Sequence, residues 1–130
     1  MINTNKSTKL ARVSDLLQVI SPEPRLQILL AIGSGDACVC HLQARLGYRQ
    51  AYISQQLMAL REAGLLDSRR DGKFIFYRLV KPGILELLQK TAQIAGVTMV
   101  EAKPAEHKKQ CACPQCAPAV SNSLLIEHAR

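Results

Sequence analysis

Five cysteines are the residues of this chain best suited to chemistry, and they fall into two clusters. Cys38 and Cys40 are separated by one residue, and Cys111, Cys113 and Cys116 follow much later in the chain. Thiolates bind soft or borderline ions such as Zn(II), Cd(II), Pb(II), Cu(I) and the metalloid As(III). In a chain expected to stay in a reducing compartment, such clusters indicate metal or redox chemistry more than structural disulfides.

The spacing of Cys38 and Cys40 limits what this pair can do alone. Residues i and i+2 lie about 200° apart around a helix, and they face opposite sides of a strand. The pair can therefore hold one ion only at an irregular helix start, or with ligands from elsewhere. His41 is a candidate further ligand, although its position favours a solvent-exposed role.

The C-terminal cysteines can supply the missing ligands. The segment 111–116, CACPQC, contains a C-x-C that overlaps a C-x-x-C, and a C-x-x-C loop can hold one ion with both sulfurs. Either these cysteines join Cys38 and Cys40 in one shared site, or the tail holds its own ion and Cys38 and Cys40 form a second site or none. The plainer interpretation is that Cys38 and Cys40 are small buried hydrophobic residues and that the tail cluster is incidental.

Apolar residues recur at helical spacing in the segments that must position these cysteines. The pattern predicts helices over roughly 10–20, 22–32, 40–46, 49–63 and 82–95. Gly47 suits a tight turn between the third and fourth helices. The stretch 65–79 predicts two strands joined by an Arg70-Asp71-Gly72-Lys73 turn. A helix-turn-helix followed by such a hairpin is a winged helix-turn-helix, mainly α with a small β-hairpin.

Composition and charge narrow the class of protein. Of 130 residues, 48% are hydrophobic but only 4% aromatic, which favours packed helices over a β-sandwich. We expect one DNA-binding and dimerisation domain over residues 1–98, followed by a flexible, cysteine-containing tail over 99–130. The net charge of +7 indicates a phosphate-rich or otherwise anionic partner. No apolar run approaches the roughly 20 residues of a membrane span, and the N-terminus lacks the apolar core of a signal peptide, so a cytoplasmic location is expected.

Three stretches resemble the ArsR/SmtB family of bacterial metal-responsive repressors. They are VCHLQARLG, ISQQLMALREAGLL and RRDGKFIFYRL, and the resemblance covers roughly Leu10 to Ala95. Its most specific parts are the run 38–42, CVCHL, the LREAGLL helix end and the wing pattern G-x-x-x-x-Y-x-L. The resemblance implies a homodimer joined through the first and last helices, which binds an inverted-repeat operator and is released by an inducer.

The chain also departs from the family pattern. Arg49 replaces the usual Ser at the start of the recognition helix, and Gln56 stands where His is frequent. In place of the Asp/His pair of the family's zinc site, the last helix offers only Glu86, Gln89 and Gln93. The cysteine that precedes the first helix in some cadmium and lead sensors is absent as well. We therefore expect no zinc site in the last helix.

The fourth helix and the hairpin carry residues suited to DNA. Gln can pair with adenine edges, Ser with bases or phosphate, and Arg or Lys with phosphate or the minor groove. A solvated polar face would have similar residues, but the basic charge and the winged helix favour DNA. The predicted contacts are Arg49, Gln50, Tyr52, Ser54, Gln55, Arg69, Arg70 and Lys73.

Together these observations predict a transcriptional repressor that binds double-stranded operator DNA as a homodimer. Its release is predicted to follow binding of As(III), Cd(II) or Pb(II) to the cysteines, with Zn(II) a weaker candidate. One alternative is a thiol redox or persulfide-sensing repressor on the same scaffold; another is a constitutive DNA-binding protein whose tail stores metal. An enzyme is not expected, because no Ser/His/Asp set, phosphate loop or paired carboxylates occur.

Overall fold

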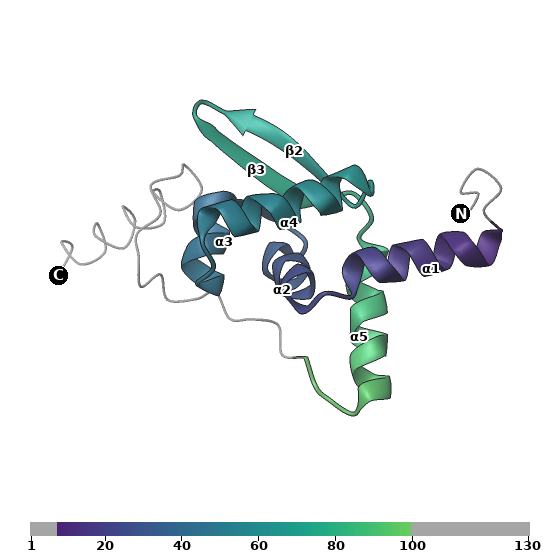
Figure 1. The fold of residues 1–130 in the computed structure, drawn as a ribbon. Coiled ribbons are helices and arrows are strands. Elements are labelled where there is room, and N and C mark those ends of the chain that lie inside the picture. Colours follow the sequence, from purple (N-terminus) through teal and green to yellow (C-terminus); the bar gives the residue numbers. More distant parts are fainter. Residues whose placement is uncertain (1–7, 100–130) are drawn as a thin grey trace.

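Helices dominate the computed structural model, which describes residues 8–99 (Figure 1). The elements follow in the order α1 (Lys9–Ile20), α2 (Glu23–Ile32), β1 (Asp36–Cys38), α3 (Val39–Leu46), α4 (Gln50–Glu62), β2 (Leu66–Asp71), β3 (Phe74–Leu79) and α5 (Gly83–Ala95). The helix-turn-helix formed by α3 and α4, with the β2–β3 hairpin after it, confirms the predicted winged helix-turn-helix.

Local sequence explains where the helices of the DNA-binding unit begin and end. The Sγ of Cys38 accepts a hydrogen bond from the backbone N–H of His41 and so caps the start of α3. Gly47 ends α3 with a positive φ of 80°, a value that glycine adopts without strain. The chain then needs only two more residues before α4 begins, which fixes the tight turn between the two helices.

A core of Leu and Ile side chains holds these helices together. Ile28 and Leu29 on α2, Leu42 on α3, and Ile53 and Leu57 on α4 have no solvent exposure. They belong to one cluster that also includes residues at the ends of the wing and on α5. Helix α4, the second helix of the helix-turn-helix and the expected recognition helix, is therefore anchored by its apolar side, and its opposite side is left for another role.

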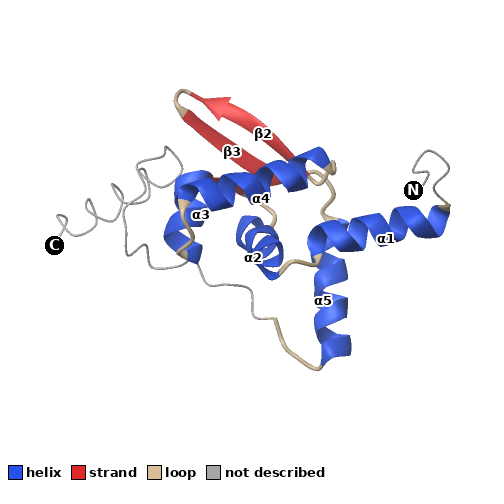
Figure 2. Ribbon diagram, in the orientation of Figure 1, coloured by secondary structure: helices blue, strands red, loops and turns tan. Residues whose placement is uncertain are grey.

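The sheet is larger than the predicted hairpin, because β1 adds a third strand to the β2–β3 wing. The strand order is β1-β3-β2, and β1 pairs antiparallel with β3. The other two strands, β2 and β3, form the hairpin drawn in red in Figure 2. Three residues are too few for an alternating pattern, so the sequence did not reveal β1. The hairpin turn is also shorter than expected: β2 and β3 pair as far as Asp71 and Phe74, which leaves Gly72 and Lys73 as a two-residue loop. Gly72 has a φ of 62°, the positive value that the first position of a II′ turn requires.

Helices α1 and α5 extend from the body formed by α2, α3 and α4 (Figure 1). Both carry large apolar side chains at the surface, among them Leu10 with 76% and Ile94 with 88% relative exposure. These residues are not part of the core of the described chain. No helix within residues 8–99 is long and apolar enough to span a lipid bilayer.

Candidate DNA-binding surface and cysteine site

The outer side of α4 carries most of the predicted base-reading residues. Gln50, Tyr52 and Gln55 are exposed, whereas Ser54 is half-buried. Arg49 occupies the N-cap position of α4 without a side-chain cap. The first-turn N–H groups and the positive end of the helix dipole therefore remain available for an anion such as a phosphate. The structure thus places these five predicted residues along and at the start of one helix.

Two contacts that sequence patterns did not indicate hold α4 against α2. Arg25 on α2 donates from Nε to Oε1 of Gln56 on α4 at 2.8 Å. Its Nη1 also donates to the carbonyl oxygen of Val19 at 3.0 Å, a separate bond that joins α2 to α1. In the turn before α4, the Tyr48 hydroxyl donates to Oε1 of Gln27 at 2.8 Å. Hydrogen bonds between positions so far apart in sequence have no local signal, so only the fold reveals them.

The Tyr48 ring also supports a predicted DNA contact. Its centroid lies 5.1 Å from that of Tyr52, with the two planes inclined by 50°. This separation is within the range of favourable aromatic pairs. Tyr52 therefore has a defined position on the exposed side of α4, next to the turn that enters the helix.

The wing presents the remaining predicted contacts, all of them exposed. Arg70 and Lys73 lie near the tip of the hairpin, and the Lys73 Nζ is 5.5 Å from the ring centroid of Phe74. Arg69 is held more closely: its Nη2 is 3.1 Å from Oδ2 of Asp36, and its Cζ lies 4.6 Å from the ring centroid of Phe76. Arg69 thus already has an acidic partner in the protein.

Cys38 and Cys40 converge at the junction between β1 and α3. Cys38 is the last residue of β1, with extended backbone angles, and Cys40 lies in the first turn of α3. Their Sγ atoms are 2.8 Å apart. The change from strand to helix between the two residues removes the geometric conflict that a continuous helix or strand would impose. Both sulfurs also lie at a helix N-terminus, where the dipole favours negative charge.

The surroundings of this cysteine pair are aromatic. Cys38 has 1% relative exposure and packs with Phe76, which has 2%. Cys40 and Phe74 are partly buried and pack against them. Cys38 is therefore a buried residue, as the plainer interpretation expected, yet it lies in contact with the more accessible Cys40.

The two cysteine sulfurs are the type of donor that a soft ion prefers, but two ligands are too few to complete its coordination. A tetrahedral ion with sulfur ligands at about 2.3 Å separates two of them by about 3.7 Å, so Cys38 and Cys40 would have to open by roughly 1 Å. Within residues 8–99, no group of three or more His, Cys, Asp or Glu side chains is arranged to hold a metal ion. Further ligands must come from elsewhere. The predicted ligands Cys111, Cys113 and Cys116 lie outside the described residues.

Comparison with known proteins identifies the class of this winged helix-turn-helix. Residues 22–68 match the family model described as "Bacterial regulatory protein, arsR family". The segment contains α2, β1, α3 and α4, together with the start of β2. It therefore covers both the cysteine pair and the recognition helix.

Individual relatives extend the match over most of the described residues. The chain is 40% identical over 77 residues to the biofilm growth-associated repressor of Agrobacterium fabrum, a match that spans 66% of that relative. It is 39% identical over 83 residues to the arsenic resistance transcriptional regulator ArsR2 of Pseudomonas putida, spanning 61% of this chain and 72% of that one. The crystal structure of the transcriptional repressor BigR from Xylella fastidiosa is 32% identical with a TM-score of 0.62, over 72% of this chain and 96% of that one.

This chain belongs to the ArsR family of bacterial transcriptional regulators. Proteins of this family bind DNA through a winged helix-turn-helix and are not enzymes. Membership confirms the resemblance noted in the sequence and the expectation of DNA as a partner.

Proposed function

We propose that this protein is a homodimeric repressor that leaves its operator when a soft metal or metalloid ion binds at Cys38 and Cys40. As(III), Cd(II) and Pb(II) are the favoured ions, and Zn(II) is a weaker candidate. The observation that carries the proposal is the 2.8 Å separation of the two sulfurs at the start of α3. Helix α3 leads through a single tight turn into the recognition helix, so a change at the cysteines lies close to the DNA-binding surface.

Two features support DNA binding by α4 and the wing. The exposed side of α4 carries Gln50 and Gln55, which have the donors and acceptors that read adenine in the major groove. Arg49, Arg70 and Lys73 supply exposed cations around them, as phosphate contacts require. Residues suited to base contacts and residues suited to phosphate contacts thus occur on the same surface. This combination favours sequence-specific DNA binding over purely electrostatic, non-specific binding.

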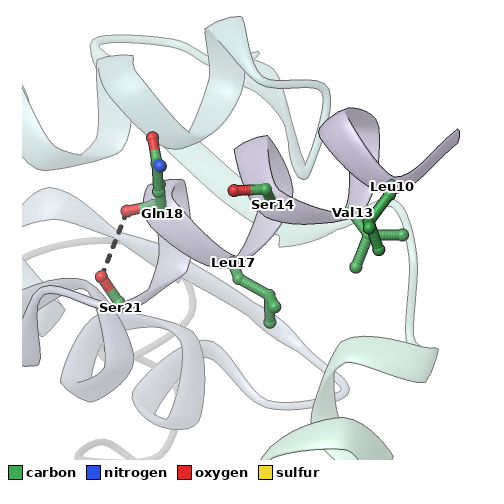
Figure 3. A pocket seen from close by; sticks show the side chains of 6 residues that line it. All are labelled: Leu10, Val13, Ser14, Leu17, Gln18 and Ser21. Atoms are coloured by element: carbon green, nitrogen blue, oxygen red, sulfur yellow. Dashed lines mark hydrogen bonds between the residues drawn. The ribbon is translucent and has the colours of Figure 1, made fainter. Parts of the chain in front are cut away.

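The apolar surface of α1 supports a homodimer. Leu10, Val13 and Leu17 lie along one side of this helix and line an open groove of ≈ 320 Å³ (Figure 3). A second open groove of ≈ 360 Å³ lies between α1, α2 and α5, and its lining is almost entirely apolar. A second copy of the chain would cover these side chains and place two recognition helices on one duplex, as an inverted repeat requires.

The donor set and the relatives support a soft ion as inducer. Thiolates prefer As(III), Cd(II) and Pb(II) to hard cations, and the Pseudomonas putida relative is named an arsenic resistance regulator. We propose that tail cysteines Cys111, Cys113 and Cys116 complete the coordination, from the same or the other subunit. Opening the sulfur pair by roughly 1 Å to hold an ion would move the start of α3, and α4 with it.

A DNA-release assay tests this function. A duplex selected from a random library on the wild-type protein is labelled, bound, and titrated with arsenite, Cd(II), Pb(II) or Zn(II) while its anisotropy is recorded. The expected result is release by at least one of the first three ions, at a coupling of about 1–3 kcal/mol. Failure of all four ions to release the DNA, with Cys38→Ser behaving as wild type, would overturn the proposal.

A chain that ends at Met99 tests the role of the tail separately. This variant keeps every element of the described fold and removes all three tail cysteines. We expect it to bind the selected duplex as wild type does, but to bind arsenite more weakly and to need more of it for release. Equal arsenite affinity in the two chains would show that the tail supplies no ligand.

A thiol redox or persulfide-sensing repressor is the second candidate, because close sulfurs also suit covalent linkage. Oxidation by peroxide would remove two protons and two electrons from a pair of thiols to form a disulfide, with peroxide reduced to water. Intact-mass measurement separates the candidates. Loss of two hydrogens, or addition of sulfur atoms, together with DNA release would favour the redox function over ion binding.

A further inference from the structure

One face of the three-stranded sheet joins the cysteine pair to the wing. In the antiparallel register, Cys38 on β1 is opposite Phe76 on β3, and Phe76 is in turn opposite Arg69 on β2. Directly opposed residues of an antiparallel sheet point to the same side. Cys38, Phe76 and Arg69 therefore form one row across all three strands, with the aromatic ring in the middle.

The contacts within this row are close. Cys38 and Phe76 are both buried and pack against each other. The guanidinium of Arg69 lies over the ring of Phe76, with Cζ at 4.6 Å from the centroid, within the roughly 6 Å of a cation–π interaction. A buried side chain thus separates the sulfur of Cys38 from a cation that is itself 56% exposed.

Asp36 holds Arg69 from the same side of the sheet. It lies two residues before Cys38 on β1, so its side chain shares the face of the row. Its Oδ2 accepts from Nε and Nη2 of Arg69 at 3.2 and 3.1 Å. The strand order β1-β3-β2 means that this ion pair spans the central strand above Phe76. Arg69 is therefore fixed by two residues, and both flank the cysteine site.

We propose that Asp36 and Phe76 are positioning residues that control how far Arg69 is available to DNA. Asp36 competes with a backbone phosphate for the guanidinium, so it lowers the DNA affinity of the wing. Phe76 transmits displacement of Cys38 to Arg69, so that the cysteine site acts on the wing as well as on α4. This inference rests on the proposed function for its DNA partner, but it concerns residues that the soft-ion proposal does not use.

The competition predicts a specific pattern in a double-mutant cycle. Duplex affinity and its salt dependence are measured by anisotropy for the wild type, Asp36→Asn, Arg69→Gln and the double variant, without any added ion. We expect Arg69→Gln to weaken binding by about tenfold and to reduce the salt slope by about 1. Asp36→Asn should strengthen binding by about twofold to fivefold, the range of an exposed ion pair. In the double variant the gain should vanish.

Asp67→Asn is the matched control for charge. Asp67 lies on β2, on the same sheet face, and pairs with Arg78 at 3.4 Å instead of with Arg69. We expect Asp67→Asn to increase duplex affinity by less than half as much as Asp36→Asn does. An equal gain in Asp67→Asn, or a full gain from Asp36→Asn in the Arg69→Gln background, would show a general charge effect and overturn the inference.

Unchanged DNA affinity in Asp36→Asn would also overturn the inference about Asp36. The proposed function would remain intact in that case, because the wild type would still bind the duplex. If the wild type binds no duplex from the library, the proposed function fails first and the inference fails with it. Asp36 and Arg69 lie at partly exposed and exposed positions, so their substitution should not disturb the core. The melting temperature of each variant checks that the fold is retained.

Discussion

The Sγ atoms of Cys38 and Cys40 lie 2.8 Å apart, although only one residue separates them in the sequence. The chain passes from β1 to α3 at this point, so the side chains follow neither helical nor strand geometry. Cys38 also acts as the N-cap of α3 through its bond from the His41 N–H at 3.3 Å. One side chain therefore stabilises the helix and, in the proposed function, binds the inducer.

Substitutions at Cys38 should separate these two roles. Serine keeps an acceptor for the His41 N–H, whereas alanine does not, so we expect Cys38→Ala to be less stable than Cys38→Ser by about 1 kcal/mol. Both should lose arsenite-induced release of DNA, because neither keeps the thiolate. Urea unfolding measures the first difference, and anisotropy measures the second. Release of DNA from Cys38→Ser at wild-type arsenite concentrations would remove Cys38 from the site.

The exposed side of α4 should determine base preference. We expect Gln50→Ala or Gln55→Ala to weaken binding by about 1–3 kcal/mol and to relax preference at single base positions. Arg49→Gln should instead weaken all duplexes alike and lower the salt slope by about 1. A panel of single-substitution duplexes distinguishes the two patterns. Gln93→Ala on α5 is the matched control, and a comparable loss from it would point away from α4 as the reading helix.

Dimer formation should depend on the apolar residues that α1 and α5 expose. Leu10→Glu and Ile94→Glu place charges at positions with 76% and 88% relative exposure, so the protomer should still fold. We expect each of these two variants to sediment as a monomer and to keep its helical circular dichroism. Operator affinity should fall by at least about tenfold, because the two half-sites are no longer bound by one dimer. Val80→Glu, at another exposed apolar position, should remain dimeric. A dimer in all three variants would place the interface elsewhere.

The link between α2 and α4 should contribute to stability. Arg25→Ala removes the bonds to Gln56 and to the Val19 carbonyl, and we expect it to lower the free energy of unfolding by about 1–3 kcal/mol. Arg12→Ala, at an exposed position on α1, should change it by less than about 0.5 kcal/mol. Equal unfolding curves for the two variants would show that the Arg25 bonds add nothing in solution.

Phe76 should affect inducer response more than DNA affinity. Phe76→Leu keeps an apolar side chain between Cys38 and Arg69 but removes the ring beneath the guanidinium. We expect arsenite to bind this variant as it binds wild type, yet to release DNA less completely. Isothermal titration measures the binding, and anisotropy measures the release. Unchanged release, with a melting temperature near that of wild type, would indicate that the signal passes only through α3 and α4.

The order of the helices and the presence of the wing could be predicted, because both depend on local sequence patterns. Periodic Leu and Ile residues mark the helices, and the Asp-Gly-containing turn marks the hairpin. Strand β1 was missed because Asp36–Cys38 contains only three residues, and its strand character arises from pairing with β3. The ion pair between Asp36 and Arg69 could not be predicted for the same reason. Without β1, nothing in the sequence places Asp36 beside the wing. The Arg25–Gln56 bond joins residues 31 positions apart, a relationship that only the tertiary fold creates.

A single titration tests most directly whether ion binding to the cysteines releases DNA. Anaerobic protein bound to a labelled duplex is titrated with Cd(II) while sulfur-to-metal charge-transfer absorbance and DNA anisotropy are recorded in the same sample. The proposed function predicts that the two signals change together, and that Cys38→Ser and Cys40→Ser each abolish release without preventing DNA binding. Saturation of the absorbance with no change in anisotropy, or release that persists in both variants, would contradict it.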